Sequence, residues 1–307
     1  MRFFPDNEEE ISLIKFIAEY QYINVSDAKY FFKSSRYYRN RIKNLIDKNI
    51  LRKIKWSLAL DETGIEYCRL LNIKCNKLNR NKTYRQRLLK LSNIAAYYQS
   101  CETVKFIPSF SIKDKEVFTT TGRRYIGIFD INGFEYLTYK ITKEHDNRYI
   151  ASVIYDIQKE TTYKNFIVLV DDINRINIKD IAFGYNSVLV IEDNEINREK
   201  LKYLHSIRWK ELIDKNFKGA YLSEYNFCEY SSNERKYINT FYFIDAEKIN
   251  RFKYFIKEDL SKKAYIICNV ELEKKLKKEF PDVHYCVVDL NEYIDKEKKI
   301  YEINGFW

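Results

Sequence analysis

The sequence predicts an α+β amino-terminal module followed by a larger α/β module. Residues 1–80 contain amphipathic helical segments and one short alternating hairpin, whereas residues 84–307 contain continuous apolar strands between helical segments. The positive charge is also uneven, because residues 1–92 hold 20 of the 54 Lys/Arg but only 10 of the 44 Asp/Glu. Both observations fit a module that binds a polyanion, joined to an electrically neutral module.

The amino-terminal module is predicted to run helix, helix, turn, helix, hairpin, helix. Apolar residues recur at three- and four-residue spacing over 8–20, and a second, shorter helix is indicated over 26–32. Residues 33–35 make the turn before a basic helix, residues 51–60 alternate like a hairpin, and residues 61–71 begin the last helix. This order is that of a winged helix-turn-helix.

The basic helix and hairpin within residues 33–55 carry most of the functional signal. One apolar face of the helix is predicted to hold Tyr38, Ile42, Leu45 and Ile46. The stretch contains nine Lys/Arg and a single acidic residue. A face of Arg, Asn and Tyr fits a DNA major groove, where Arg pairs with guanine and Asn pairs with adenine. The residues predicted to contact DNA are Ser35, Arg36, Tyr37, Arg39, Asn40, Arg41, Lys43, Lys53 and Lys55.

The ends of this helix and hairpin carry further expectations. A hydroxyl of Ser34 or Ser35 is expected to cap the first helical turn. Trp56 is expected to pack in the core beneath the hairpin, with a DNA-contacting position as the alternative. For the helix as a whole, the alternative to DNA binding is a solvated basic surface on an ordinary globular protein.

The segment that leaves the first module is basic as well. Residues 73–90 carry seven Lys/Arg and no acidic residue. These cations either extend the phosphate-binding surface or form a solvated hinge. The polar composition predicts a boundary near 76–84, which gives a DNA-binding domain over 1–80 and a second domain over 84–307.

The second domain is predicted to contain a mixed, largely parallel sheet. Continuous apolar strands such as FIVLV and SVLVI indicate a sheet buried on both faces. Helices are predicted over 84–100, 147–159, 178–183, 194–209 and 271–280. Strands are predicted over 104–107, 116–129, 134–141, 165–170, 187–191, 240–244, 251–256, 264–270 and 283–290.

The order helix, three-strand meander, helix, strand is the core order of the PD-(D/E)xK nucleases. Asn132-Gly133 predicts the tight turn of the meander. Ile126 and Thr138 stand where two metal-binding carboxylates would be required, so we expect the fold of a restriction endonuclease without its catalytic or metal site. The alternative is an active nuclease that uses Asp130, Glu135 and Lys140.

A pattern after the hairpin carries a family resemblance. Leu60, Thr63, Gly64 and Tyr67 resemble the "LT-x-x-G" ending of bacterial winged-helix proteins. Together with the domain order over residues 8–195, the chain resembles the replication-relaxation proteins of plasmids and mobile elements. The resemblance implies a sequence-specific double-stranded DNA-binding protein that assists plasmid replication or conjugative transfer within a relaxosome.

Other classes of function have little support in the sequence. No apolar run approaches the length of about 18 residues that a membrane-spanning helix needs, and the six cysteines form no CxxC pair, so a cytoplasmic protein with free thiols is expected. We expect no cofactor. Double-stranded DNA is the expected partner, and replication or relaxosome proteins and a second copy of the chain are further candidates.

One alternative function concerns the acidic residues that end two predicted strands. Asp171-Asp172 and Glu192-Asp193 are placed either to bind a ligand or to cap the helices that follow. The ligand interpretation corresponds to a transcriptional regulator whose α/β domain senses a ligand or a partner.

Overall fold

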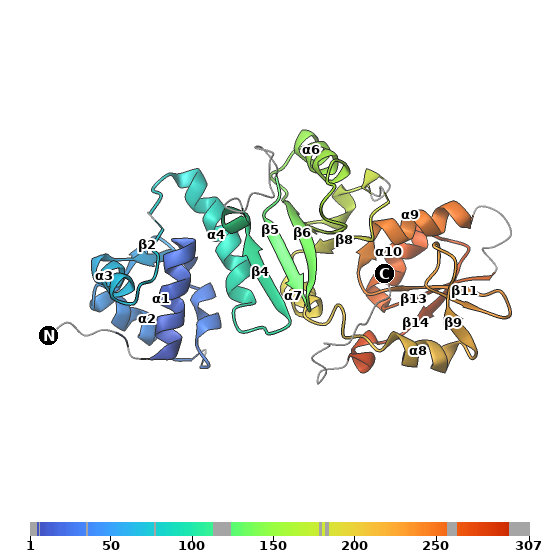
Figure 1. Ribbon diagram of the computed structural model, residues 1–307, viewed down its shortest axis with the longest axis horizontal. Helices are drawn as coiled ribbons and strands as arrows, with labels where there is room; N and C mark the ends of the chain where they lie inside the picture. Colours follow the sequence, from blue (N-terminus) through green and yellow to red (C-terminus); the bar gives the residue numbers. More distant parts are fainter. Residues whose placement is uncertain are drawn as a thin grey trace. The chain divides into compact units, whose positions relative to one another are not determined.

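Contacts divide the chain into two compact units, unit 1 (Met1–Pro108) and unit 2 (Ser109–Trp307), each described separately below. The division falls later than the predicted boundary near 76–84, because helix α4 (Lys82–Tyr97) packs against other elements of unit 1. The computed structural model describes residues 5, 7–34, 36–76, 78–112, 124–177, 180–181, 184–256 and 263–294 (Figure 1).

Unit 1 contains the predicted series of helices and a hairpin. Its first helix has the predicted bounds, and Asn7 caps it by accepting a hydrogen bond from the Glu9 amide. The elements are α1 (Glu8–Tyr20), β1 (Ile23–Asn24), the 3-10 helix η1 (Asp27–Phe31), α2 (Tyr38–Asp47), β2 (Leu51–Ile54), β3 (Ser57–Leu60), α3 (Glu62–Leu70), α4 and β4 (Val104–Pro108).

The predicted helix over 26–32 is a short 3-10 helix. The carboxylate of Asp27 does not cap an α-helix, because its Oδ2 accepts hydrogen bonds from the side-chain amides of Asn24 and Asn93. At Phe32 the backbone returns to an extended conformation. These contacts fix η1 between β1 and α4.

The core of unit 1 lies around α1 and a three-stranded sheet of order β1-β3-β2. Leu13 and Ile14 of α1 are fully buried, as are Ile23 and Leu58, which pair across β1 and β3. The predicted hairpin is confirmed as the antiparallel pair β2–β3, in which Lys53 stands opposite Leu58.

The larger sheet of unit 2 runs in the order β12-β8-β7-β6-β5 within that unit. The strands β6 and β7 have the predicted bounds, and the consecutive residues Phe166 to Val170 are all buried, as expected for a strand covered on both faces. The strands are β5 (Gly127–Ile131), β6 (Phe134–Ile141), β7 (Asn165–Val170), β8 (Ser187–Glu192) and β12 (Ile244–Asp245).

The turn between β5 and β6 is the predicted two-residue hairpin. Asn132 and Gly133 both have positive φ, at 53° and 85°, as the mirror-image hairpin turn requires. Of the strand predicted over 116–129, residues 116–123 lie outside the described residues and residues 124–126 are not in a strand, so β5 runs from Gly127 to Ile131.

A second sheet in unit 2 was not predicted as separate. Its order is β14-β13-β11-β10-β9, and Figure 1 shows α9 and α10 on one side of it and α8 on the other. The strands are β9 (Ala220–Leu222), β10 (Tyr230–Ser232), β11 (Tyr237–Phe241), β13 (Ala264–Cys268) and β14 (His284–Val287).

The described helices of unit 2 are α5 (Ser109–Ile112), α6 (Asn147–Gln158), α7 (Glu195–Leu201), α8 (Trp209–Asn216), α9 (Ala246–Phe255) and α10 (Val270–Glu279), with 3-10 helices η2 (Ile173–Arg175) and η5 (Leu290–Tyr293).

The prediction of one largely parallel sheet is therefore wrong, although both sheets are mixed. In the larger sheet β6–β7 and β7–β8 are parallel, while β5–β6 and β12–β8 are antiparallel. In the smaller sheet β11–β13 and β13–β14 are parallel, while β10 pairs antiparallel with both β9 and β11.

Several predicted elements of unit 2 are wrong in type or extent, and the strand predicted over 240–244 is divided between β11 and β12. The predicted strand over 251–256 is the end of α9, a helix capped by Asp245 and buried through Ile249 and Phe252 at three-residue spacing. The predicted helix over 194–209 ends at Leu201. Of the helical piece predicted over 178–183, most lies outside the described residues.

In the described part of the chain, no helix combines the length and the apolar character needed to cross a membrane.

Candidate nucleic-acid interface

The basic helix α2 is held against unit 1 by its apolar face. Tyr38, Ile42 and Leu45 are buried, as predicted. The turn before the helix is also fixed, because the amide of Lys33 donates a hydrogen bond of 2.9 Å to Glu9 Oε1 on α1. Burial of one face leaves the opposite face of α2 directed away from the core.

The predicted serine cap of α2 is wrong for Ser34, and Ser35 lies outside the described residues. The helix begins at Tyr38, and the capping position is Tyr37, which makes no capping hydrogen bond through its side chain. Without a side-chain cap, the amino-terminal amides of α2 are left to other acceptors, of which a phosphate oxygen is one.

The residues predicted to read DNA are exposed. Arg36 and Tyr37 lie in the turn just before α2, with Tyr37 60% exposed, and Asn40 and Lys43 lie on the outer face of the helix. Among the described residues, neither Arg36 nor Lys43 forms an ion pair. Their charges are therefore free to meet phosphates or base edges.

Two arginines of α2 have contacts within the protein. Arg41 Nη1 lies 3.1 Å from Glu10 Oε1, and Glu10 is a buried residue of α1. Arg39 Nε donates a long hydrogen bond of 3.4 Å to the hydroxyl of Tyr38. Both guanidinium groups remain exposed, so they can contact a phosphate while keeping these partners.

The tip of the β2–β3 hairpin presents a second basic and aromatic group. Lys53 is exposed, and Lys55 occupies the tip with a positive φ of 57°. The expectation that Trp56 packs in the core is wrong, because its side chain is 81% exposed and lies under Lys53 Nζ at 6.0 Å from the ring centroid. The Val25 amide donates to the Trp56 carbonyl oxygen at 3.0 Å, which ties the tip to β1.

The residues of the alternative nuclease site do not converge. Asp130 and Glu135 are directly opposite on β5 and β6 beside the turn, and Asp130 Oδ1 accepts a hydrogen bond from the Gly133 amide. Lys140 instead forms a short ion pair with Asp193. Within the described ranges, no group of three or more His, Cys, Asp or Glu residues is arranged to hold a metal ion.

Asp193 is the centre of a buried ion cluster. Its side chain is 3% exposed and receives Lys140 and, at 2.6 Å, the Nε of Arg198. Burial by itself raises the pKa of Asp193, but the hydrogen bond from Arg198 and the charges of Lys140 and Arg198 outweigh burial and hold that pKa below its usual value. The cluster joins the ends of β6 and β8 to α7.

The other carboxylates at the strand ends have structural roles. Asp172 caps η2 by accepting from the Asn174 amide, as the capping alternative predicts. Asp171 accepts from the amide of Lys143. Glu192 differs, because it faces a pocket.

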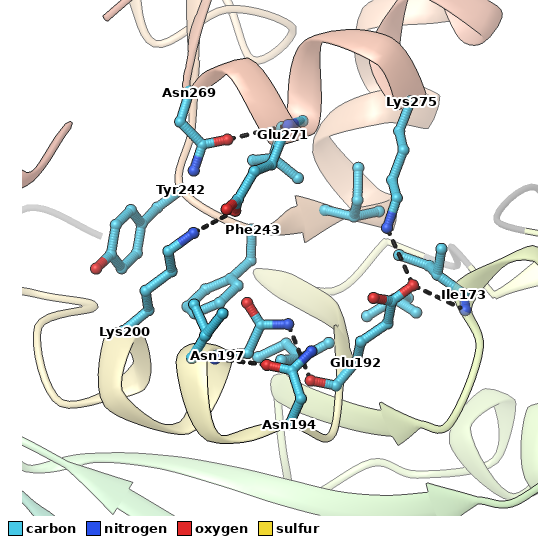
Figure 2. Close-up of a pocket in the computed structure, with 15 residues that line it drawn as sticks. Ile173, Glu192, Asn194, Asn197, Lys200, Tyr242, Phe243, Asn269, Glu271 and Lys275 are labelled. Atoms are coloured by element: carbon cyan, nitrogen blue, oxygen red, sulfur yellow. Dashed lines mark hydrogen bonds and ion pairs between the residues drawn. The ribbon is translucent and has the colours of Figure 1, made fainter. Parts of the chain in front are cut away.

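This pocket of about 240 Å³ lies between the end of β8, helix α7 and helix α10 (Figure 2). Two ion pairs cross the pocket, and α10 supplies the lysine of one pair and the glutamate of the other. Lys275 Nζ on α10 contacts Glu192 Oε1 at 3.1 Å, and Lys200 on α7 forms a short pair with Glu271 on α10. The lining charges therefore sum to zero.

Amide and apolar side chains complete the pocket. Asn194 and Asn269 cap α7 and α10, because their side-chain oxygens accept hydrogen bonds of 2.9 and 3.0 Å from the amides of Asn197 and Leu272. The two asparagines that follow β8 and β13 are a signal in the sequence for this site, which the prediction from Glu192 and Asp193 alone does not include. The exposed Ile196 lies at the rim, at 63% exposure.

Comparisons of the chain with protein-family models, with curated proteins and with solved structures gave no match. A proposal of function therefore rests on the sequence and on the geometry of the two units.

Proposed function

We propose that unit 1 carries a winged helix-turn-helix and that the protein binds double-stranded DNA in a sequence-specific manner. The observation that carries the proposal is the exposed surface formed by the outer face of α2 and the turn before it, with the side chains of Arg36, Tyr37, Asn40 and Lys43. Neither of its two cations, Arg36 and Lys43, has an ion-pair partner among the described residues. Such a face combines donors that recognise base edges with charges that neutralise phosphates.

The order of elements in unit 1 supports the same proposal. In a winged helix-turn-helix the recognition helix enters the major groove and the wing follows the backbone. Here α2 takes the place of the recognition helix, and the β2–β3 tip with Lys53, Lys55 and Trp56 takes the place of the wing. Arg39 and Arg41 flank the groove-facing side and are assigned to phosphates.

We further propose that the protein acts as an accessory factor in replication or conjugative transfer of a plasmid or other mobile element. This part is supported by the resemblance of domain order over residues 8–195 to the replication-relaxation proteins. Apart from the four-residue helix α5, the order α4, β4, α5, β5, β6, α6, β7 also follows the core order of the restriction-endonuclease-like fold. Since Ile126 and Thr138 replace its carboxylates, unit 2 is assigned a scaffolding role in dimerisation or in recruiting partner proteins.

The test is selection of duplexes from a random DNA library by the full chain, followed by binding of the selected duplex. Arg36→Ala and Asn40→Ala should each weaken the selected duplex by about 1–3 kcal/mol and relax the preference at one position. Lys53→Ala should weaken all duplexes equally and lower the salt dependence.

Lys15→Ala is the matched control, because Lys15 is an exposed lysine on α1, outside both α2 and the hairpin. It should leave both affinity and preference unchanged. The proposal fails if no duplex is enriched, or if the α2 variants bind the selected duplex like the unchanged protein.

A second candidate function is supported by the pocket beside Glu192. A transcriptional regulator with the same DNA-binding unit would use this pocket to sense a small ligand. A small molecule that raises the thermal midpoint of the full chain, but not that of a Glu192→Gln variant, would favour this function. A relaxase or plasmid replication gene next to the gene for this protein would favour the accessory-factor function.

A further inference from the structure

Three arginines of unit 1 lie on segments that surround Tyr22. Arg52 lies on β2, Arg80 lies just before α4, and Arg85 lies in the first turn of α4. Among the described residues, none of the three forms an ion pair. The group of these three residues is called the arginine cluster below.

The register of the sheet places Arg52 and Tyr22 on the same face. Arg52 pairs with Ala59, and Tyr22 directly precedes Ile23, which pairs with Leu58 on the same central strand β3. Because neighbouring residues of a strand point to opposite faces, Tyr22 and Arg52 stand on either side of the small, fully buried Ala59. Helix α4 packs against β1 beside them.

The segment that carries Arg80 and Arg85 is fixed to the same place. The hydroxyl of Tyr22 donates to the carbonyl oxygen of Asn79 at 2.8 Å, and the Asn79 amide donates to Gln21 Oε1 at 2.8 Å. Arg80 is the next residue. One turn into α4, the amide of Arg85 donates to the carbonyl oxygen of Asn81 at 2.9 Å.

The electrostatics around Tyr22 agree with this geometry. Burial raises the pKa of the Tyr22 hydroxyl, while the positive charges of Arg85, Arg52 and Arg80 act in the opposite direction. The Nε of Arg52 is buried and has no hydrogen-bond partner within the described part of the chain. Three positive charges that all act on one tyrosine hydroxyl also repel one another, and an anion bound among them relieves that repulsion.

We propose that the arginine cluster is a second phosphate-binding surface, which holds nucleic-acid backbone outside the segment read by α2. The inference rests on the proposed DNA-binding function and adds a contact that carries no sequence information. Guanidinium groups match the paired oxygens of a phosphodiester, so the expected ligand is a duplex DNA backbone.

The experiment measures the affinity of the full chain for a mixed-sequence duplex over a series of salt concentrations. Arg80→Ala/Arg85→Ala is expected to weaken this duplex about tenfold and to lower the salt slope by about 2, one for each lost phosphate contact. Arg80→Lys/Arg85→Lys keeps the charge and should retain most of the salt slope.

The control Lys15→Ala/Lys105→Ala removes two exposed positive charges elsewhere in unit 1 and should lower neither quantity to this extent. The proposal is overturned if Arg80→Ala/Arg85→Ala and Lys15→Ala/Lys105→Ala lower the affinity and the salt slope equally. It is also overturned if the unchanged protein does not bind the duplex. Thermal unfolding of each variant separates lost contacts from lost structure.

The same titrations distinguish this inference from the proposed function. If Asn40→Ala leaves the preference for the selected duplex unchanged while Arg80→Ala/Arg85→Ala still lowers the salt slope, α2 does not read the sequence and the arginine cluster stands. If the preference depends on Asn40 but the salt slope does not depend on Arg80 and Arg85, α2 reads the sequence and the arginine cluster does not bind phosphate.

Discussion

The carbonyl oxygen of Ile50 lies 2.2 Å from the position that a β-carbon on Gly64 would occupy. Helix α3 therefore passes directly over the backbone at the start of the β2–β3 hairpin, and only a glycine permits this approach. The Ile50 carbonyl oxygen also accepts the Asp61 amide at 2.9 Å, which restrains it from moving away. Close packing of α3 against the Ile50 backbone thus explains why a glycine stands at position 64, in the "TG" pattern after the hairpin.

Gly64→Ala should destabilise unit 1 by about 1–3 kcal/mol, because the added methyl group is forced into backbone atoms, even though alanine favours a helix by about 1 kcal/mol over glycine. Calorimetry of the full chain should show a lower unfolding midpoint, and hydrogen exchange should show loss of protection in α3. Gly133→Ala is the comparison: its φ is +85° but no atom lies within 4 Å. An unchanged or raised unfolding midpoint in Gly64→Ala would contradict the packing explanation, whereas the loss in Gly133→Ala measures backbone strain alone.

Trp56 at the hairpin tip allows DNA contact to be separated from stability. Because the ring is 81% exposed, Trp56→Ala should change the free energy of unfolding by less than about 0.5 kcal/mol. It should nevertheless weaken duplex binding by about 1 kcal/mol or more, since it removes an aromatic contact surface and the ring beneath Lys53. Tyr221→Ala, at a half-exposed aromatic residue of unit 2, is the control for binding. A large loss of stability without a loss of duplex binding would contradict the assignment of Trp56 to DNA contact.

Elements encoded by local periodicity could be predicted from the sequence. The helix α1 and the strands β6 and β7 have the expected bounds, because a single apolar face or a continuous apolar run defines each of them. The turn at Asn132 and Gly133 was also predictable, since its residue types match the required positive φ.

Elements that depend on distant partners could not be predicted. The apolar run at the end of β11 divides, because Phe241 stays in the smaller sheet while Ile244 pairs with Val190 of the larger one. The helix predicted over 194–209 ends at Leu201, and His205 beyond its end contacts Tyr136 of β6. Neither event leaves a local pattern in the sequence.

In the candidate site too, some features follow from local sequence pattern and others depend on contacts between distant segments. Exposure of Asn40 and Lys43 follows from the helical period alone. The contact of Arg41 with Glu10 and the exposure of Trp56 do not, because both depend on how α1 and the hairpin pack in space. Arg52 and Tyr22 share a face of the sheet only through the register of β1, β3 and β2.

The buried cluster around Asp193 is predicted to stabilise unit 2. Asp193→Asn keeps the shape of the side chain but leaves Lys140 and Arg198 without their countercharge, which should cost about 3–5 kcal/mol of the free energy of unfolding. Replacing Lys140 by Met in the same chain should restore part of that loss. Glu211→Gln, which breaks an exposed pair with Arg208, should cost less than about 1 kcal/mol. A tolerated Asp193→Asn with full stability would show that the cluster is dispensable.

His205 is predicted to make unit 2 sensitive to mild acid. Burial and the charge of Lys248 lower its pKa to about 4, and its Nε2 lies 3.0 Å from the hydroxyl of Tyr136. The pKa of this histidine in the unfolded chain is near 6.5. Between about pH 4 and pH 6.5 His205 therefore binds a proton in the unfolded chain but not in the folded chain. Stability should be full above about pH 6.5 and should fall by about 2–3 kcal/mol as the pH drops to about 4. Calorimetric midpoints measured across this range should lose most of that dependence in His205→Gln, whereas His284→Gln, at an exposed histidine, should keep it. The same pH dependence in both variants would assign it to other groups.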